Sequence, residues 1–189
     1  MKQIVILATL SIALLFDSCR KESVPNLALP AATQTGQNTL GFLLDSKVWN
    51  NYGRRCTIAG CNDNKVTAHL YKQPNGDFYL EISADYTVMS ETIDQSFFIY
   101  TTNVTTTGNY FLDTSLNRGM TFIASRYNQT YKEYKNKQPN NCTLTITKFD
   151  TTNKIISGSF NGVIYNPANL NDSTKIQDGR FDAYLDYRQ

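Results

Sequence analysis

The chain has 189 residues, which is enough for one domain whose hydrophobic core needs no support from metals or many disulfides. Charged residues make up 18%, and 18 Lys and Arg stand against 16 Asp and Glu, giving a net charge of +2. This small excess excludes a polybasic binder of nucleic acid or of a membrane surface. The single histidine, His69, excludes any mechanism that needs two imidazoles.

Residues 1–18 are predicted to be a signal peptide. Lys2 supplies a positive start, and residues 4–16 form an apolar run. As a helix this run would span about 20 Å, short of the ~30 Å hydrocarbon core, so a secretory signal is favoured over a membrane span. Ser18 directly before Cys19 resembles a bacterial lipobox, which implies cleavage before Cys19 and its lipidation. The alternative is an ordinary signal peptide followed by an incidental cysteine.

Residues 19–38 are predicted to form a flexible tether. The segment is rich in Pro, Ala, Thr and Gln and contains no aromatic residue. As a flexible coil it would reach on the order of 25 Å. Together with a lipid on Cys19, this predicts a cell-envelope protein, anchored in the outer membrane and either periplasmic or exposed at the cell surface.

Residues 39–189 are predicted to form one all-β domain. Apolar residues alternate at period two, whereas a long helical period is missing. Asn75-Gly76 supplies the positive φ angles of a tight hairpin, Gly158 and Gly162 indicate a bulge or bend, and Asp178-Gly179 indicates a turn. The pattern favours a single antiparallel β-sandwich or flattened β-barrel of about 8–10 strands. The expected strands are residues 40–44, 66–70, 78–84, 96–101, 109–112, 120–126, 142–149, 154–165, 175–177 and 180–187.

Three cysteines remain once Cys19 carries a lipid. Cys56 and Cys61 enclose four residues, and an exported chain sits in an oxidising space, so a disulfide between them is predicted. Cys142 is then expected to be a buried free thiol on the apolar face of its strand. A zinc site made by the three cysteines and His69 is the alternative, but it lacks paired Cys-x₂-Cys spacing, so no metal is expected.

A segment that mixes aromatic and basic residues, numbers 126–137, is the candidate ligand-contact loop. Its tyrosines are spaced four and three apart, which would align them on one face of a helical turn. Aromatic rings stack on the apolar faces of sugars and lysines contact anions, so a glycan or an acidic partner would fit. The alternative is a solvated connection between strands. The residues concerned are Arg126, Tyr127, Tyr131, Lys132, Tyr134 and Lys135.

Catalytic residues and cofactor motifs are not evident in the sequence. His69 stands alone in a predicted strand, no Gly-x-Ser-x-Gly elbow occurs, and many carboxylates fall at predicted turns. No cofactor and no nucleic acid are expected. A non-enzymatic binding or structural module that contacts a glycan or an envelope protein is therefore predicted, and an exported hydrolase using Asp and Glu carboxylates is the alternative.

Two parts of the chain resemble a family of uncharacterised Bacteroidetes lipoproteins, catalogued as a domain of unknown function. The first, residues 29–49, contains Thr-Gln-Thr-Gly-Gln-Asn-Thr and Lys-Val-Trp. The second contains Lys-Ile-Ile-Ser-Gly-Ser-Phe and Asp-Gly-Arg-Phe-Asp, within residues 143–185. Members often carry a cysteine where this chain has Phe42. The resemblance implies an exported, lipid-anchored, mostly β protein and transfers no catalytic residue.

Overall fold

The computed structural model describes residues 26–58, 60–125, 131–137 and 142–188. The predicted signal peptide, the lipidation site Cys19 and two members of the candidate loop, Arg126 and Tyr127, lie outside these residues. Within the described ranges, two 3₁₀ turns are the only helical elements, and no helix is long and apolar enough to cross a membrane.

Thirteen strands and two 3₁₀ turns make up the described part of the chain. The turns are η1, Met89–Glu91, and η2, Thr114–Leu116. The strands are β1 Thr39–Leu44, β2 Lys47–Asn50, β3 Arg54–Thr57, β4 Gly60–Asp63, β5 Thr67–Lys72, β6 Phe78–Val88, β7 Ile93–Thr102, β8 Gly108–Phe111, β9 Gly119–Ser125, β10 Lys132–Asn136, β11 Thr143–Asp150, β12 Ile155–Asn166 and β13 Asn169–Arg188.

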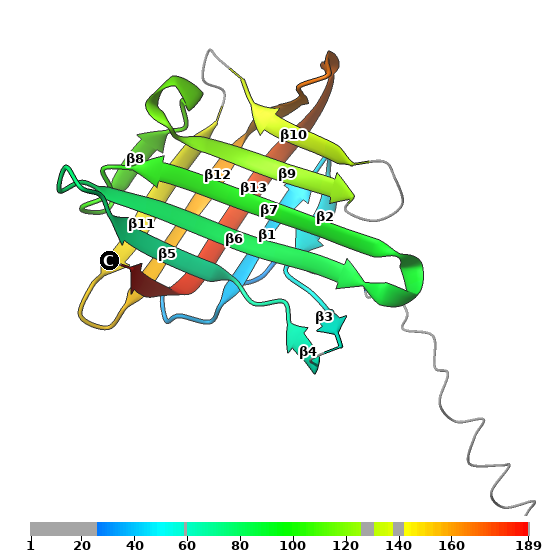
Figure 1. Ribbon diagram of the computed structural model, residues 1–189, viewed down its shortest axis with the longest axis horizontal. Coiled ribbons are helices and arrows are strands. Elements are labelled where there is room, and N and C mark those ends of the chain that lie inside the picture. Colours follow the sequence, from blue (N-terminus) through cyan, green and yellow to red (C-terminus); the bar gives the residue numbers. More distant parts are fainter. Residues whose placement is uncertain (1–25, 59, 126–130, 138–141, 189) are drawn as a thin grey trace, which may run out of the picture.

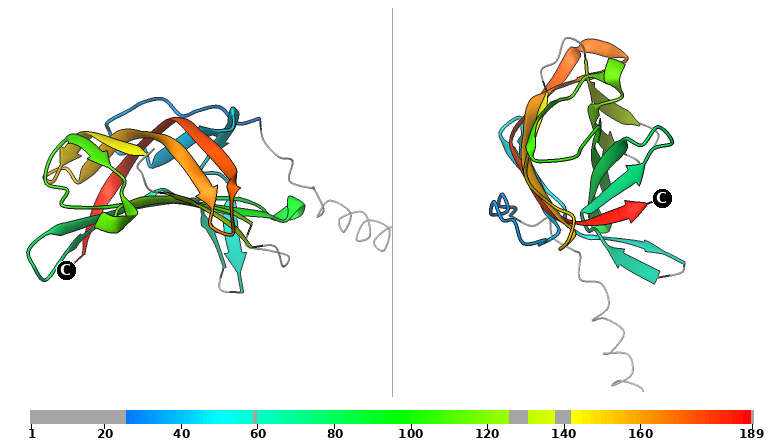
Figure 2. Two further views of the ribbon diagram at one scale, coloured as in Figure 1. Left: turned by 90° about the horizontal axis from the view of Figure 1, so that it is seen from above. Right: turned by 90° about the vertical axis from the view of Figure 1, so that its left-hand side faces the viewer.

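The strands form two layers that cross at a steep angle (Figure 1). Eleven strands pair in the order β2-β1-β13-β5-β6-β7-β9-β10-β12-β11-β8, and β12 also pairs with β13. The five strands β5, β6, β7, β9 and β10 form the front layer, and the other six curve behind it (Figure 2). The layers join where β13 meets β5 and where β10 meets β12. The sandwich-like all-β prediction is confirmed, although the sheet does not close into a clean barrel.

Aromatic rings fill the space between the layers. Phe42 of β1 is fully buried, and its ring centroid lies 4.8 Å from that of Trp49 and 4.6 Å from that of Phe97. Phe122 and Phe160 contact the same ring edge-on, at 6.4 Å and 5.8 Å. These rings come from five strands and both layers. Phe42, where relatives are expected to carry a cysteine, is therefore a central residue of this core.

Two local turn predictions had different outcomes. The hairpin at Asn75-Gly76 is confirmed, with Gly76 at a φ of 90° between β5 and β6. The turn expected at Asp178-Gly179 is instead a bulge inside the single long strand β13, which replaces two predicted strands. A Cβ at Gly179 would lie 2.5 Å from the Phe160 ring, so the bulge lets the two strands pack closely. The expectation of a bulge at Gly162 is confirmed by the register shift beside it.

The sheet is not purely antiparallel, and it has more strands than predicted. β13 and β5 pair in parallel, with Leu185 opposite Ala68. The strands that sequence reasoning missed are β2, β3, β4 and β10, each only four or five residues long. Runs this short show too little alternation to be recognised by periodicity.

The second half of the predicted flexible tether is attached to the domain. Its described part, residues 26–38, lies on the domain, and four of its donors bind the carboxylate of Asp182. Asp182 is only 1% exposed, so its charge requires such partners. The donors are the Thr33 hydroxyl at 2.7 Å and the backbone N–H groups of Thr35, Gly36 and Gln37 at 3.0, 2.9 and 3.1 Å; the Ser157 hydroxyl donates a fifth bond at 2.8 Å.

Candidate functional site

The candidate ligand-contact loop is partly a strand, so the predicted helical face is wrong for its described residues. Tyr131 is 65% exposed, whereas Tyr134 lies in β10 and is only 7% exposed. The Tyr134 ring packs near that of Phe122, and its hydroxyl donates to Asp172 at 3.1 Å. Tyr134 is therefore a core residue, because alternation along a strand separates side chains that a helix would align.

Two of the three lysines in residues 126–137, Lys132 and Lys135, are paired with acidic side chains. Lys132 Nζ lies 3.0 Å from Asp172 Oδ2 and 5.1 Å from the centroid of the Tyr134 ring. Lys135 Nζ lies 3.1 Å from Glu133 Oε2. Both lysines are exposed, so these pairs hold the side chains in place with little gain in stability.

The three described cysteines, Cys56, Cys61 and Cys142, are arranged as predicted. Cys56 and Cys61 face each other across the β3–β4 hairpin and form a disulfide, with their Cα atoms 4.0 Å apart. Cys142 is a buried free thiol that donates to the Val163 carbonyl at 3.4 Å. Burial raises the pKa of this thiol to about 11 and outweighs the opposing effect of the hydrogen bond. Within the described ranges, no group of three metal-ligating side chains could hold a metal ion.

Three tyrosines on the outer face of the front layer form a surface that sequence reasoning missed. Tyr71, Tyr79 and Tyr100 come from the adjacent strands β5, β6 and β7. The ring centroid of Tyr79 lies 5.9 Å from that of Tyr71 and 6.4 Å from that of Tyr100. Each ring is half-buried, while the neighbouring positions Leu70, Leu80 and Ile99 point into the core. These three tyrosines are called the tyrosine row below.

A glycine makes room for one end of the tyrosine row. Gly119 of β9 pairs with Tyr100, and a Cβ there would lie 2.4 Å from the Tyr100 ring and hydroxyl. The ring of Tyr100 therefore covers the position where a side chain of β9 would otherwise stand. The Asn136 side chain borders the same spot, held by its bonds to Met120 N and to the Leu112 carbonyl.

Charged side chains border the other end of the row. His69 Nδ1 lies 3.1 Å from Asp186 Oδ2, and Arg188 Nε donates to the same oxygen at 2.8 Å. The hydrogen bond from Arg188 holds the pKa of Asp186 below its usual range. Glu81 of β6 lies opposite His69 on one side and Tyr100 on the other. The tyrosine row thus lies among groups that donate and accept hydrogen bonds.

Tyr79, the central ring of the row, is neutral at physiological pH. Burial, followed by the negative charge of Glu81 and the neighbouring phenols, raises the pKa of Tyr79 to about 12. A neutral phenol offers an apolar ring face together with a hydroxyl that can donate or accept. A row of such half-buried rings suits a ligand with flat apolar faces and many hydroxyl groups.

Part of this surface was readable in the sequence. Tyr71 and Tyr79 flank the predicted Asn75-Gly76 hairpin, and its register places them directly opposite each other. Tyr100 could not be added, because its place depends on the register of β7 against β6.

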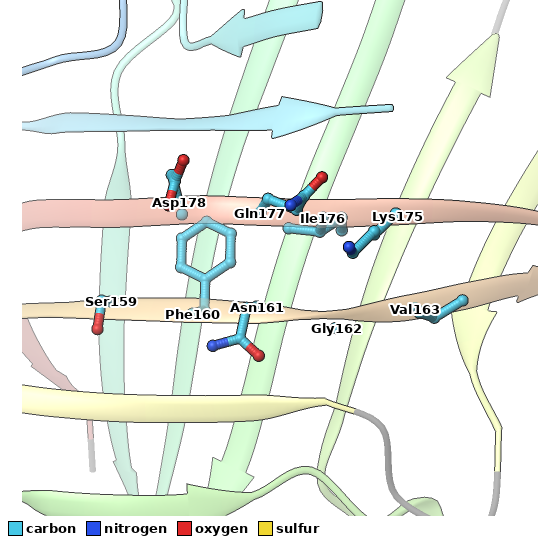
Figure 3. A pocket seen from close by; sticks show the side chains of 10 residues that line it. Ser159, Phe160, Asn161, Gly162, Val163, Lys175, Ile176, Gln177 and Asp178 are labelled. Atoms are coloured by element: carbon cyan, nitrogen blue, oxygen red, sulfur yellow. The ribbon is translucent and has the colours of Figure 1, made fainter. Parts of the chain in front are cut away.

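A second surface feature is a hollow of about 500 Å³ on the outer face of the rear layer, between β12 and β13 (Figure 3). It lies at the register shift between these strands, and Gly162 and Gly179 are part of its lining. Its other side chains are mostly polar, and its one ring, that of Phe160, is only 2% exposed. The hollow therefore offers hydrogen bonds without an open aromatic face. The polar residues are Ser159, Asn161, Lys175, Gln177 and Asp178.

The fold and these surfaces define a sandwich-like all-β domain with an aromatic row on one outer face. Comparison with known families places it further: residues 50–183, more than half of the chain, match a domain of unknown function, DUF5025. The chain belongs to this family. No curated protein and no solved structure matches the chain.

Proposed function

We propose that this protein is a non-enzymatic binding module, lipid-anchored through Cys19 in the outer membrane of the cell envelope, that holds a glycan on the tyrosine row. The observation that carries the proposal is the row itself, with three ring centroids spaced 5.9 and 6.4 Å apart across adjacent strands. The C–H faces of sugar rings pack against aromatic rings, and the spacing lets one chain contact several rings in succession.

The surroundings of the row support a ligand rich in hydroxyl groups. The Glu81 carboxylate accepts hydrogen bonds, and the Arg188 guanidinium donates them. Arg188 pairs in register with Tyr71, so it stands at the outer end of the row. Acceptors and donors within reach of an aromatic surface are the combination that orients a sugar as well as holding it.

The position of Asn26, the first described residue, relative to the row also fits an anchored module. Asn26 lies beside Tyr86 and Lys47. Tyr86 is seven residues from Tyr79 along β6, roughly 23 Å at the rise of a strand. Cys19 precedes Asn26 by seven residues. A lipid on Cys19 would therefore hold the end of the domain near Asn26 toward the membrane and leave the row at the other end accessible.

Affinity electrophoresis against a panel of polysaccharides tests glycan binding. Tyr79→Ala removes the central ring and should weaken binding about tenfold, the equivalent of one aromatic contact of about 1.4 kcal/mol. Phe111→Ala is the matched control, because it removes an exposed ring from β8 in the rear layer. Equal retardation of the wild type and Tyr79→Ala would contradict the proposal, as would retardation by no polysaccharide in the panel.

Two further measurements address the anchor and the hydrolase alternative. Labelling of growing cells with a palmitate analogue should mark the wild type and leave Cys19→Ala unmarked. For a binding module, incubation with a bound polysaccharide should release no new reducing ends. If new reducing ends appear and Glu81→Gln abolishes them, the protein is instead a hydrolase, since the Glu81 carboxylate acts on Tyr79 and pairs in register with Tyr100.

A further inference from the structure

A second hollow, of about 490 Å³, lies beside β10 at the edge of the front layer. Its apolar part is made by Tyr165, at the end of β12, and by Pro167 and Leu170 in and after the following turn. Leu170 is 48% exposed, so this part is open to solvent. Thr114, Asn136 and the exposed lysines Lys135 and Lys137 complete the lining. It is called the β10 hollow below.

The β10 hollow adjoins the tyrosine row. Asn136 lines the hollow, and its Oδ1 atom lies 2.9 Å from the point that a Cβ of Gly119 would occupy. The hydroxyl of Tyr100 lies 2.4 Å from the same point. The last ring of the row and the wall of the hollow therefore meet over Gly119. A chain-like ligand that extends along the row past Tyr100 would therefore be directed toward the hollow.

Positive charge predominates at this junction. Lys132 and Lys135 are neutralised by Asp172 and Glu133. In the part of the chain that the structure describes, Lys137 has no carboxylate partner. The same holds for Arg118, whose Nε donates to the Thr102 hydroxyl next to the row. These two cations remain available to a negatively charged group.

We infer that the β10 hollow binds an acidic sugar unit, bearing a carboxylate or a sulfate, of the glycan that lies on the tyrosine row. The inference rests on the proposed glycan-binding function and specifies its ligand. The apolar face of the sugar packs against Tyr165 and Leu170, while Lys137 contacts the anionic group. Glu81 lies at the middle of the row, so a negative charge on the ligand is favoured at the hollow and not over the rings.

Two matched pairs of polymers test this inference on the purified mature protein. The first pair is polygalacturonate and its methyl ester, and the second is a sulfated galactan and its desulfated form. At low salt one acidic form should bind about tenfold more tightly than its neutral counterpart, and 0.5 M salt should remove most of this advantage. The pair that shows the advantage distinguishes a carboxylate from a sulfate.

Variants locate the effect. Arg118→Ala combined with Lys137→Ala, which removes the two cations without a carboxylate partner, should abolish the acidic advantage and affect binding of the neutral form much less. Lys175→Ala is the matched control, since Lys175 lines the hollow of similar size in the rear layer (Figure 3). Equal binding of acidic and neutral forms, an advantage that survives the double variant, or failure of every acidic form to bind would overturn the inference. In each of these cases the proposed glycan-binding function would still hold if a neutral polymer binds and Tyr79→Ala weakens that binding.

Discussion

Replacing Asp182 by asparagine removes the charge that holds the N-terminal segment on the domain. The change keeps the size of the side chain but turns an acceptor oxygen into an amide donor. Asp182 Oδ1 accepts from Gly36 N and from the Ser157 hydroxyl, so an amide nitrogen there leaves the Gly36 N–H without a partner. One unsatisfied buried donor costs about 1–3 kcal/mol, and the remaining bonds weaken because they are no longer assisted by charge. The total loss of stability should be about 3 kcal/mol.

The pKa of Asp182 gives a second route to this magnitude. Burial alone would raise it, but the hydrogen bonds from Thr33, Gln37, Ser157 and Gly36 prevail and lower it to about 2, from 3.8. A carboxyl whose pKa is lowered by folding stabilises the protein above its unfolded-state pKa. This contribution, about 2–3 kcal/mol, is present at pH 7 and lost as the pH falls through 3.8 toward 2.

Urea unfolding, followed by the fluorescence of the single buried tryptophan Trp49, measures both effects. Asp182→Asn should unfold more easily than the wild type by about 3 kcal/mol at pH 7, and the difference should shrink by roughly 1–2 kcal/mol at pH 2.5. Asp178→Asn, at an exposed position in the same strand, is the control and should change stability by less than about 0.5 kcal/mol. A loss at pH 7 as small as that of the control, or a difference independent of pH, would refute the reasoning.

Three further predictions concern the thiols and the site. Replacing Cys56 and Cys61 by serine should lower the free energy of unfolding by about 2 kcal/mol, measured by calorimetry, without abolishing folding, because the bridge closes only a short loop. Iodoacetamide should label Cys142 only after unfolding, as mass spectrometry would show, since the thiol is buried with a pKa of about 11. Gly119→Ala should displace the Tyr100 ring and weaken glycan binding in affinity electrophoresis; affinity equal to the wild type would argue against a role for that ring.

Alternation predicted the strands well where one face is buried and the run is long. In β6, Leu80, Ile82 and Ala84 are all buried, as their spacing indicates. The same method divided β13 at Asp178-Gly179, because a turn-forming dipeptide looks alike in a hairpin and in a bulge. The difference lies in the partner strand: Phe160 pairs with Gly179 and occupies the space that a side chain would fill. The local sequence around Gly179 does not indicate that Phe160 will pair with it.

The site was harder to predict than the fold because it is assembled across strands. The tyrosines of residues 127–134 are close in sequence and suggested a surface, yet Tyr134 faces the core. Tyr71, Tyr79 and Tyr100 are spread over thirty residues and meet only through the register of three strands. The composition shows that tyrosine is abundant, but it does not indicate which tyrosine rings share a face of the sheet.

The buried carboxylate cluster and the tyrosine row lie in different parts of the domain. Thr33 to Gln37 precede the residues that match the family, Ser157 and Asp182 lie within them, and all of these meet at the Asp182 carboxylate. The tyrosine row also lies within the matched residues, but on the opposite layer. Substitutions at distant sites have additive effects on stability, so the stabilising role of the buried cluster and the binding role of the tyrosine row should be separable. Asp182→Asn should therefore lower the free energy of unfolding, and under conditions where it is folded it should bind the glycan with unchanged affinity. Tyr79→Ala should lower the affinity for the glycan and leave the free energy of unfolding unchanged. Loss of affinity in folded Asp182→Asn would show that the row depends on the buried cluster.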